Sequence, residues 1–253
     1  MKKACRISAE SHVEAMKFVK PGMTEQEMEA FYLYEFAKRG GRFSAYTPIV
    51  AGGENACVLH YVENSKPLLD GDLLLVDAGC EYNFYASDIT RTFPVSGKFT
   101  DAQLAIYEVV LEAESKAIAA VSVNNNVMDA QIISEKVVTQ GLIDLGILKG
   151  SLDDLHAKGA FKEFYMHKIG HWLGIDVHDA GDYMEDDQFM QFKPGMVTTI
   201  EPGIYIPSSA NVDDKWKGIG IRIEDDILVT PDGNENLTEF VPSNPKEIEA
   251  LMA

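Results

Sequence analysis

Four acidic residues lie inside or at the end of apolar, strand-like segments of the chain. They are Asp77 in LLLVDAG, Asp88 in SDITRTF, Glu201 in TTIEPG and Glu224 in IGIRIEDD. A carboxylate taken out of water needs a partner of opposite charge, and Arg222, the base beside Glu224, supplies only one. Two divalent cations would balance four carboxylates. The pattern therefore predicts a two-metal site, with metal ions roughly 3.5–4 Å apart.

The two aspartates are expected to face each other in a β-hairpin. If Tyr82 and Asn83 form the turn, because asparagine tolerates a positive φ, the strand register pairs Asp77 directly with Asp88. Directly paired residues have Cβ atoms roughly 4.5–5.5 Å apart, and like charges at that distance repel each other. A solvated hairpin with outward-pointing acids is the simpler alternative. The apolar run before Asp77 and the second pair of acids favour a functional site.

Three of the six histidines lie in HKIGHWLGIDVHD, residues 167–179. His167 and His171 are one helical turn apart, but the glycines around His171 disfavour a helix, and GIDVHD alternates like a strand. These glycines permit a close approach, so His171 is the expected nitrogen ligand. His167, His178 and His60, at the end of the predicted strand ENACVLHY, remain for proton transfer or substrate contact. Oxygen ligands with one imidazole suit Mn²⁺ or Co²⁺.

The order of the predicted elements repeats once, because two helices precede a run of strands in each half of the chain. Two of the helices begin with capping boxes, Thr24 with Glu27 and Thr100 with Gln103. This order favours an α+β fold over a doubly wound sheet, and without any linker it predicts one domain over residues 1–253. We expect helices over 4–20, 24–40, 99–121 and 127–146, and strands over 46–53, 54–61, 70–79, 174–179, 195–206 and 218–230.

The chain carries 22 basic and 40 acidic residues, a formal charge of −18. Nucleic acid and anionic membrane surfaces are therefore not expected as partners, because both select clustered lysine and arginine. The three cysteines form no CxxC pair, which is typical of a reducing compartment. No apolar run approaches the ~18 residues of a transmembrane helix, and the N-terminal segment lacks the apolar centre of a signal peptide. A cytoplasmic location is expected.

The acids and histidines match a known family in order and in flanking sequence. Asp, Asp, His, Glu and Glu within LLLVDAG, SDITRTFPV, GHWLGIDVHD, TIEPGIY and GIRIEDD resemble the pita-bread metallopeptidases, and within them the catalytic domain of Xaa-Pro aminopeptidase (aminopeptidase P). The resemblance covers nearly all of the chain, from the first helix to NPKEIEALM. It implies the pita-bread (creatinase/aminopeptidase) fold, with two pseudo-symmetric halves around a strongly curved, mostly antiparallel sheet.

The resemblance also implies roles for individual residues. The implied ligands of two metal ions are Asp77, Asp88, His171, Glu201 and Glu224, with Asp88 and Glu224 as the bridging carboxylates. Mn²⁺ is the metal the resemblance favours, with Co²⁺ or Zn²⁺ as alternatives. The implied catalytic residues are His60, His167, His178, Glu201 and Arg222, and the implied substrate-binding residues are His60, His178 and Tyr205.

The implied reaction is hydrolysis of the bond between an N-terminal residue and a following proline, by hydroxide generated at the metal pair. The substrates would be peptides with proline in the second position, and a homo-oligomer is left open. Two alternatives also stay open. One is a prolidase, which shares the ligands but cleaves only Xaa-Pro dipeptides. The other is a non-catalytic binding module on the same fold, against which the five retained ligands argue.

Two features depart from the family pattern. The family usually has glycine directly after the first histidine of the motif, where this chain has Lys168. A lysine beside the pocket would alter substrate preference or the backbone of the loop. Family members also carry an additional N-terminal domain, and we expect it to be absent here, because this chain begins where the catalytic domain would begin.

Overall fold

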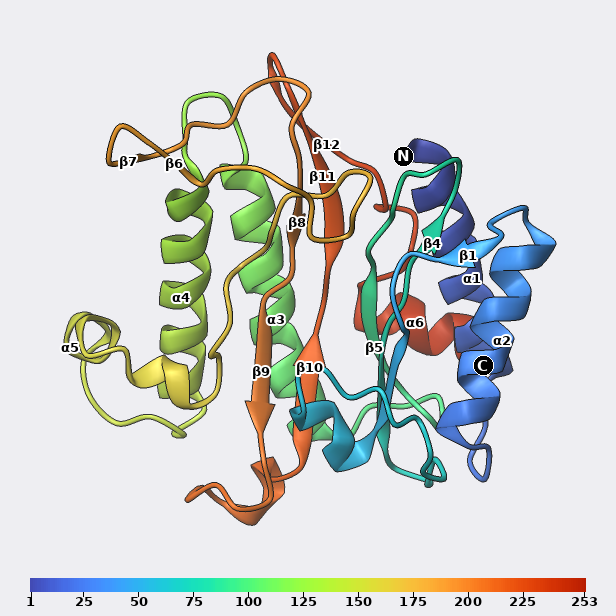
Figure 1. Ribbon diagram of the computed structural model, residues 1–253. Helices are drawn as coiled ribbons and strands as arrows, with labels where there is room; N and C mark the ends of the chain where they lie inside the picture. The colour runs from blue at the N-terminus through green and yellow to red at the C-terminus, as the bar shows by residue number, and fades with distance from the viewer.

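The computed structural model describes all residues, 1–253, as helices packed around antiparallel strands. Helices α1 and α2 lie on one side of the central strands, and α3 and α4 lie on the other (Figure 1). The helices are α1 (Lys2–Phe18), α2 (Glu25–Lys38), α3 (Asp101–Ala120), α4 (Val127–Asp144), α5 (Leu152–Ala157) and α6 (Pro245–Met252), with 3₁₀ helices η1 (Gly53–Cys57), η2 (Ala160–Glu163) and η3 (Asp214–Trp216). None of these helices is long and apolar enough to cross a lipid bilayer.

The strands form small antiparallel sheets with the orders β2-β3-β5 and β12-β11-β8, and the pairs β1-β4, β9-β10 and β6-β7. Their bounds are β1 (Phe43–Ser44), β2 (Ile49–Gly52), β3 (Leu73–Asp77), β4 (Cys80–Glu81), β5 (Thr90–Pro94), β6 (Met184–Glu185), β7 (Gln188–Phe189), β8 (Val197–Ile200), β9 (Gly203–Ile206), β10 (Ile219–Arg222), β11 (Asp225–Thr230) and β12 (Gly233–Asn236). The predicted α+β content is confirmed, and each half has a helix pair followed by a three-stranded antiparallel sheet.

The four predicted helices are present, and both predicted capping boxes form. The Thr24 hydroxyl accepts the N–H of Glu27 at 3.1 Å, and the Glu27 carboxylate accepts the N–H of Thr24 at 2.7 Å. Thr100 and Gln103 make the same pair of bonds at the start of α3. Such caps satisfy backbone donors that the first helical turn leaves free, and each is worth about 1 kcal/mol.

The predicted strand over 54–61 is wrong. Its first residues form η1 and the rest form a turn, so His60 lies in a turn rather than at the end of a strand. The cause is the buried carboxylate of Glu25, which organises this segment from α2. It accepts hydrogen bonds of 2.8 Å from Gly52 N, Asn55 Nδ2, Tyr61 OH and Lys66 N.

The predicted strand over 174–179 is also wrong. The N–H of Asp179 donates to the carbonyl of Trp172 at 2.9 Å, and the N–H of Asp176 donates to the Asp179 carboxylate at 3.3 Å. These local bonds close a turn. The segment with the alternating pattern is therefore a compact loop, and this loop places His178 next to His171.

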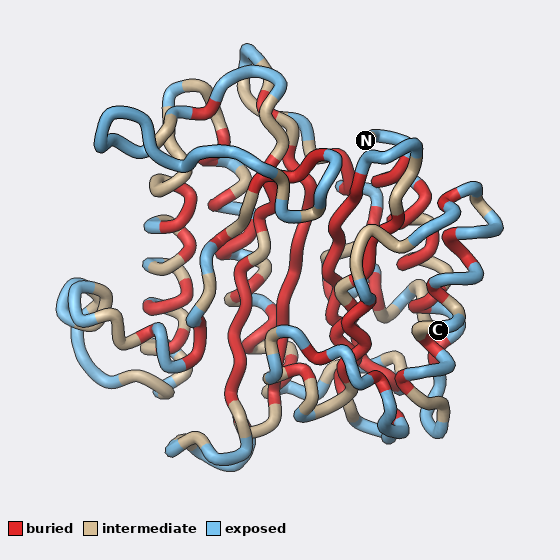
Figure 2. Tube along the Cα trace, viewed as in Figure 1, coloured by how far each residue is buried: buried red, intermediate tan, exposed pale blue.

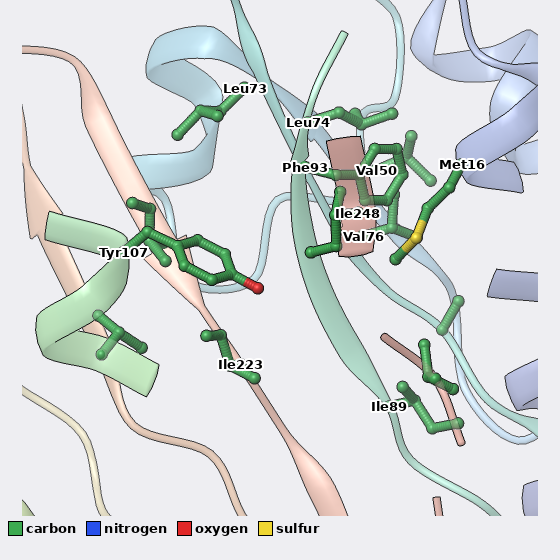
Figure 3. Close-up of a cluster of buried hydrophobic side chains, with 14 of the residues drawn as sticks. Met16, Val50, Leu73, Leu74, Val76, Ile89, Phe93, Tyr107, Ile223 and Ile248 are labelled. Atoms are coloured by element: carbon green, nitrogen blue, oxygen red, sulfur yellow. The ribbon is translucent and has the colours of Figure 1, made fainter. Parts of the chain in front are cut away.

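The two halves share one hydrophobic core. A cluster of 36 buried side chains includes residues from both halves and from α6, and Figure 2 shows the buried positions following the central strands. In Figure 3, Tyr107 of α3 and Ile223 lie in the same cluster as Leu74, Phe93 and Ile248. The core thus holds the strand ends of both halves against each other.

Candidate metal centre

The hairpin that carries the two aspartates has a different register from the predicted one. Asn83 and Phe84 are the central turn residues, with φ of 51° and 70°, so the turn lies one residue later than expected. Asp77 therefore pairs with Thr90 instead of Asp88. Because side chains alternate with a period of two, this shift of two residues leaves Asp88 on the same face as Asp77.

A tyrosine links the two aspartates. The hydroxyl of Tyr46 lies 2.6 Å from Asp77 Oδ1 and 2.5 Å from Asp88 Oδ1. The phenol has one proton and can donate to only one carboxylate at a time. Both acids therefore lie at one site although they are not direct strand partners.

All five predicted ligands converge on this site. The Nε2 atom of His171 lies 3.4 Å from Asp88 Oδ2 and 3.5 Å from Glu201 Oε1. Ligand atoms of Asp88, His171 and Glu224 all lie within 4.8 Å of one another, a grouping that can hold a metal ion. The bridge between Thr90 and Glu224 joins the halves at this point, so each half supplies predicted ligands.

His171 is oriented by its neighbours so that Nε2 faces the acids. Its Nδ1 donates to the carbonyl of Trp172 at 3.1 Å, which leaves Nε2 to bind a metal once it has lost its proton. Its backbone N–H donates to Thr199 Oγ1 at 3.0 Å. No helix forms here, as expected, and a Cβ at Gly170 would lie 1.9 Å from the carbonyl oxygen of Thr199. The glycine therefore allows close approach to strand β8.

Arg222 and Thr90 hold the carboxylates from behind. Arg222 Nη2 donates to Asp77 Oδ2 at 2.6 Å, and its Nε donates to Thr90 Oγ1 at 3.2 Å. Thr90 in turn donates to Glu224 Oε2 at 2.6 Å. The remaining guanidinium nitrogen, Nη1, donates to the hydroxyl of Tyr205 at 3.0 Å. One guanidinium thus neutralises Asp77, and the other three acids have only the ring of His171 as a basic neighbour.

Burial raises the pKa values of these acids and so favours their protonated forms. It raises the pKa of Asp88 to about 6, with a further contribution from the charge of Asp77, and it raises the pKa of Glu201 to about 7. Burial and the charge of Asp88 also raise the pKa of Glu224. Burial opposes charge on His171, but the hydrogen bond and charge of Asp88 outweigh it and raise its pKa to about 9. Four carboxylates and one imidazole, with Arg222 as the one permanently charged partner, form a donor set that fits two divalent ions.

The other predicted histidines surround the centre. Burial lowers the pKa of His167 to about 4, so its ring is neutral: Nδ1 donates to the carbonyl of Lys168 at 2.8 Å and Nε2 accepts from Tyr205 at 2.9 Å. The ring of His178 is edge-on to His171, with centroids 4.3 Å apart. His60 and His178 are both exposed and line the cavity.

Tyr205 does not line the cavity. Its side chain is fully buried, and its hydroxyl accepts from Arg222 and donates to His167. The expectation that Tyr205 contacts substrate directly therefore does not match its position. The structure places it behind His167, where it links that ring to Arg222.

Sequence reasoning missed three residues of the site: Tyr46, Thr90 and Thr199. Thr90 lies two residues after Asp88, and Thr199 lies two residues before Glu201, to which it donates at 3.2 Å. Strand alternation places residues two positions apart on the same face, so the sequence could have predicted both threonines on the face of the predicted ligands. Tyr46 had none, because its contact with the aspartates depends on the folded chain.

The centre forms the floor of a cavity of about 620 Å³. One wall comes from residues between 46 and 62, and the other from the first turns of α4 together with residues between 183 and 192. Half of the lining is hydrophobic, with 13 of 27 residues, so the cavity combines polar groups at its floor with apolar walls, as small-molecule and peptide sites do.

The chain matches the family model of metallopeptidase family M24 over residues 1–231. It is 51% identical over 252 residues to the Xaa-Pro aminopeptidase of Haemophilus influenzae, covering 100% of this chain and 58% of that protein. It is 48% identical over 252 residues to the Xaa-Pro aminopeptidase of Escherichia coli, covering 100% of this chain and 57% of that protein. The chain therefore belongs to metallopeptidase family M24, and its fold is the pita-bread fold of that family.

Solved structures give the same relation. The aminopeptidase PepP of Pseudomonas aeruginosa superposes with a TM-score of 0.99 at 50% identity, covering 100% of this chain and 57% of that chain. A zinc-substituted aminopeptidase P of Escherichia coli in complex with product superposes with a TM-score of 0.97 at 49% identity, covering 99% of this chain and 57% of that chain. The chain thus spans less than two thirds of the length of these relatives.

Proposed function

We propose that this chain is a metal-dependent aminopeptidase that hydrolyses the bond between an N-terminal residue and a following proline. The observation that carries the proposal is the convergence of four carboxylates and one imidazole, from both halves, on the floor of one cavity. The names of the relatives, at 48–51% identity, support this reaction over the prolidase alternative. A non-catalytic binding module would not need this buried acid cluster.

The proposed metals are two divalent cations, with Mn²⁺ favoured over Co²⁺ and Zn²⁺. Their ligands would be Asp77, Asp88, His171, Glu201 and Glu224, with Asp88 and Glu224 shared between them. When bound, the metals would lower the pKa of a water molecule and polarise the scissile carbonyl. The ligand protons that burial retains would be released on loading, so metal affinity would rise with pH.

The surrounding residues have complementary proposed roles. Glu201, with a pKa of about 7 before loading, would carry a proton to the leaving imino nitrogen. His60 and His178, exposed in the cavity, would hold the peptide carbonyl as it gains charge. His167, kept neutral by burial, would present a fixed ring edge, because Tyr205 and Arg222 hold it from behind.

Peptides with proline in the second position are the proposed substrates. One structure of the Escherichia coli enzyme contains the inhibitor Pro-Leu, which supports the binding of proline peptides. We further propose that residues 1–253 act as one catalytic domain. The strands of both halves would form one strongly curved sheet through the bridge between Thr90 and Glu224. The enzyme would be cytoplasmic. Self-association into a homo-oligomer belongs to the same proposal.

The test uses metal-stripped protein reloaded with Mn²⁺, Co²⁺ or Zn²⁺, with the bound metal counted by elemental analysis. Three peptides are compared: a tripeptide Xaa-Pro-Xaa, a dipeptide Xaa-Pro and a tripeptide without proline. Preferential cleavage of the proline tripeptide is expected. Cleavage of the dipeptide alone would identify a prolidase, and no cleavage at full metal occupancy would overturn the proposal.

A further inference from the structure

The charged residues that line the cavity are almost all engaged. Four are the acids of the metal centre, and Arg222 uses Nε, Nη1 and Nη2 to bond Thr90, Tyr205 and Asp77. Lys168 is the remaining one. Its ammonium group makes no hydrogen bond or ion pair with any residue of the chain, and its side chain is exposed.

The backbone around Lys168 is fixed to the site on both sides. Its carbonyl accepts from His167 Nδ1 at 2.8 Å. The next residue, Ile169, donates its N–H to Gln131 at 2.7 Å and accepts from the N–H of Glu201 at 2.7 Å. The backbone of Lys168 is therefore anchored beside the predicted metal ligands, and its flexible four-carbon side chain, at the lining of the cavity, ends in a free charge.

Metal loading would leave Lys168 without an acidic partner in the lining. Two divalent cations balance the four acids, so the ammonium group of Lys168 remains as an unmatched positive charge. The N-terminal amine of a peptide carries no negative charge and cannot pair with Lys168. A group of opposite charge elsewhere in the peptide is then the group that the unpaired lysine can meet.

We infer that Lys168 is a specificity-determining residue that binds a carboxylate of the peptide substrate. This inference rests on the proposed function. The carboxylate has two sources, the C-terminus of a short peptide or the side chain of an acidic residue after the proline. On a chain with a formal charge of −18, such a local cation would offset the general repulsion of acidic peptides.

The test measures binding by calorimetry to metal-loaded protein, so it does not need turnover. Two matched pairs of ligands are used: Pro-Leu against Pro-Leu amide for the terminal carboxylate, and Pro-Glu amide against Pro-Gln amide for the side chain. Because partly exposed ion pairs are modest, the carboxylate ligand of at least one pair should bind about two- to fivefold more tightly. Lys168→Gln should remove this preference and Lys168→Glu should reverse it.

Lys162→Gln is the matched control, because Lys162 is also exposed but does not line the cavity. Loss of preference in one ligand pair assigns the carboxylate to that source. A preference that Lys168→Gln leaves unchanged, or no preference in the unmodified chain, overturns the inference. Carboxylate binding that depends on Lys168 without hydrolysis of any proline tripeptide would instead overturn the proposed function alone.

Discussion

At the scale of single residues, Glu224 shows how a buried acid of the metal centre lowers the stability of the metal-free fold. It is 1% exposed, and burial and the neighbouring acids raise its pKa. Glu224→Gln removes the charge but keeps an oxygen that can accept from Thr90. We expect the metal-free variant to be about 1–2 kcal/mol more stable than the unmodified chain at pH 8. The stabilisation that added Mn²⁺ gives should be lost, together with hydrolysis.

Calorimetric unfolding with and without Mn²⁺ measures both effects. Glu185→Gln is the control, because Glu185 is an exposed glutamate on β6, and neither its stability nor its metal response should change. A Glu224→Gln protein that is still stabilised by Mn²⁺ to the full extent would remove Glu224 from the ligand set.

The protons held by the centre predict how stability depends on pH. The folded-state pKa of His171, about 9, exceeds its ordinary value of 6.5, and that of Glu201, about 7, exceeds 4.5. The folded chain therefore binds more protons than the unfolded chain as pH rises from about 6.5, and its stability falls until about pH 9. His12 and His167, with pKa values of about 4, have the opposite effect only below 6.5.

Urea unfolding of metal-free protein at several pH values between 6.5 and 9 checks this trend. With saturating Mn²⁺ the fall should disappear, because the metal takes the place of those protons. Metal-free protein that becomes more stable over this range would contradict the assignment of the retained protons to these groups.

At the scale of elements, the turn at Asn83 and Phe84 sets the register of the hairpin and holds two non-glycine residues at positive φ. Phe84 has φ of 70° and is 75% exposed, so little packing offsets the left-handed backbone. Phe84→Gly should stabilise the chain by about 0.5–1 kcal/mol, because glycine adopts this conformation without the strain.

Phe84→Ala is the control, because alanine removes the ring but keeps the strained φ. Urea denaturation of the two variants separates the two contributions. If the glycine variant is the less stable of the two, backbone strain at this turn is not the main effect and loss of unfolded-state entropy dominates.

The sequence predicted the elements that are defined by hydrogen bonds between near neighbours in the chain. It did not predict segments whose conformation depends on side chains far away in the sequence. The capping boxes at Thr24 and Thr100 use partners three residues away, and the helices begin there. The segment after Gly53 was predicted as a strand, but the carboxylate of Glu25 in α2 binds the side chains of Asn55 and Tyr61 while the segment forms η1 and a turn. The residues predicted as metal ligands do lie together around one cavity, because an apolar strand that ends in an acid is a local signal.

At the scale of the whole molecule, Arg91 connects the two halves behind the metal centre. It lies on β5 and is fully buried. Its Nη2 bonds Asp225 Oδ1 at 2.7 Å and the carbonyl of Val241 at 3.2 Å, and its Nη1 bonds the carbonyl of Glu224 at 2.7 Å. A strand of the first half thus holds the backbone of Glu224, a proposed metal ligand of the second half.

Arg91→Met should therefore destabilise the chain by about 3–5 kcal/mol, because it leaves Asp225 as a buried charge without its partner. The double variant Arg91→Met/Asp225→Asn removes that charge and should recover part of the loss. Arg6→Met, at an exposed arginine, should change stability by less than about 0.5 kcal/mol.

Since the core cluster spans both halves, urea unfolding should remain a single transition in all of these variants. A double variant no more stable than Arg91→Met would show that the lost backbone bonds, including the one to Glu224, matter more than the unpaired charge.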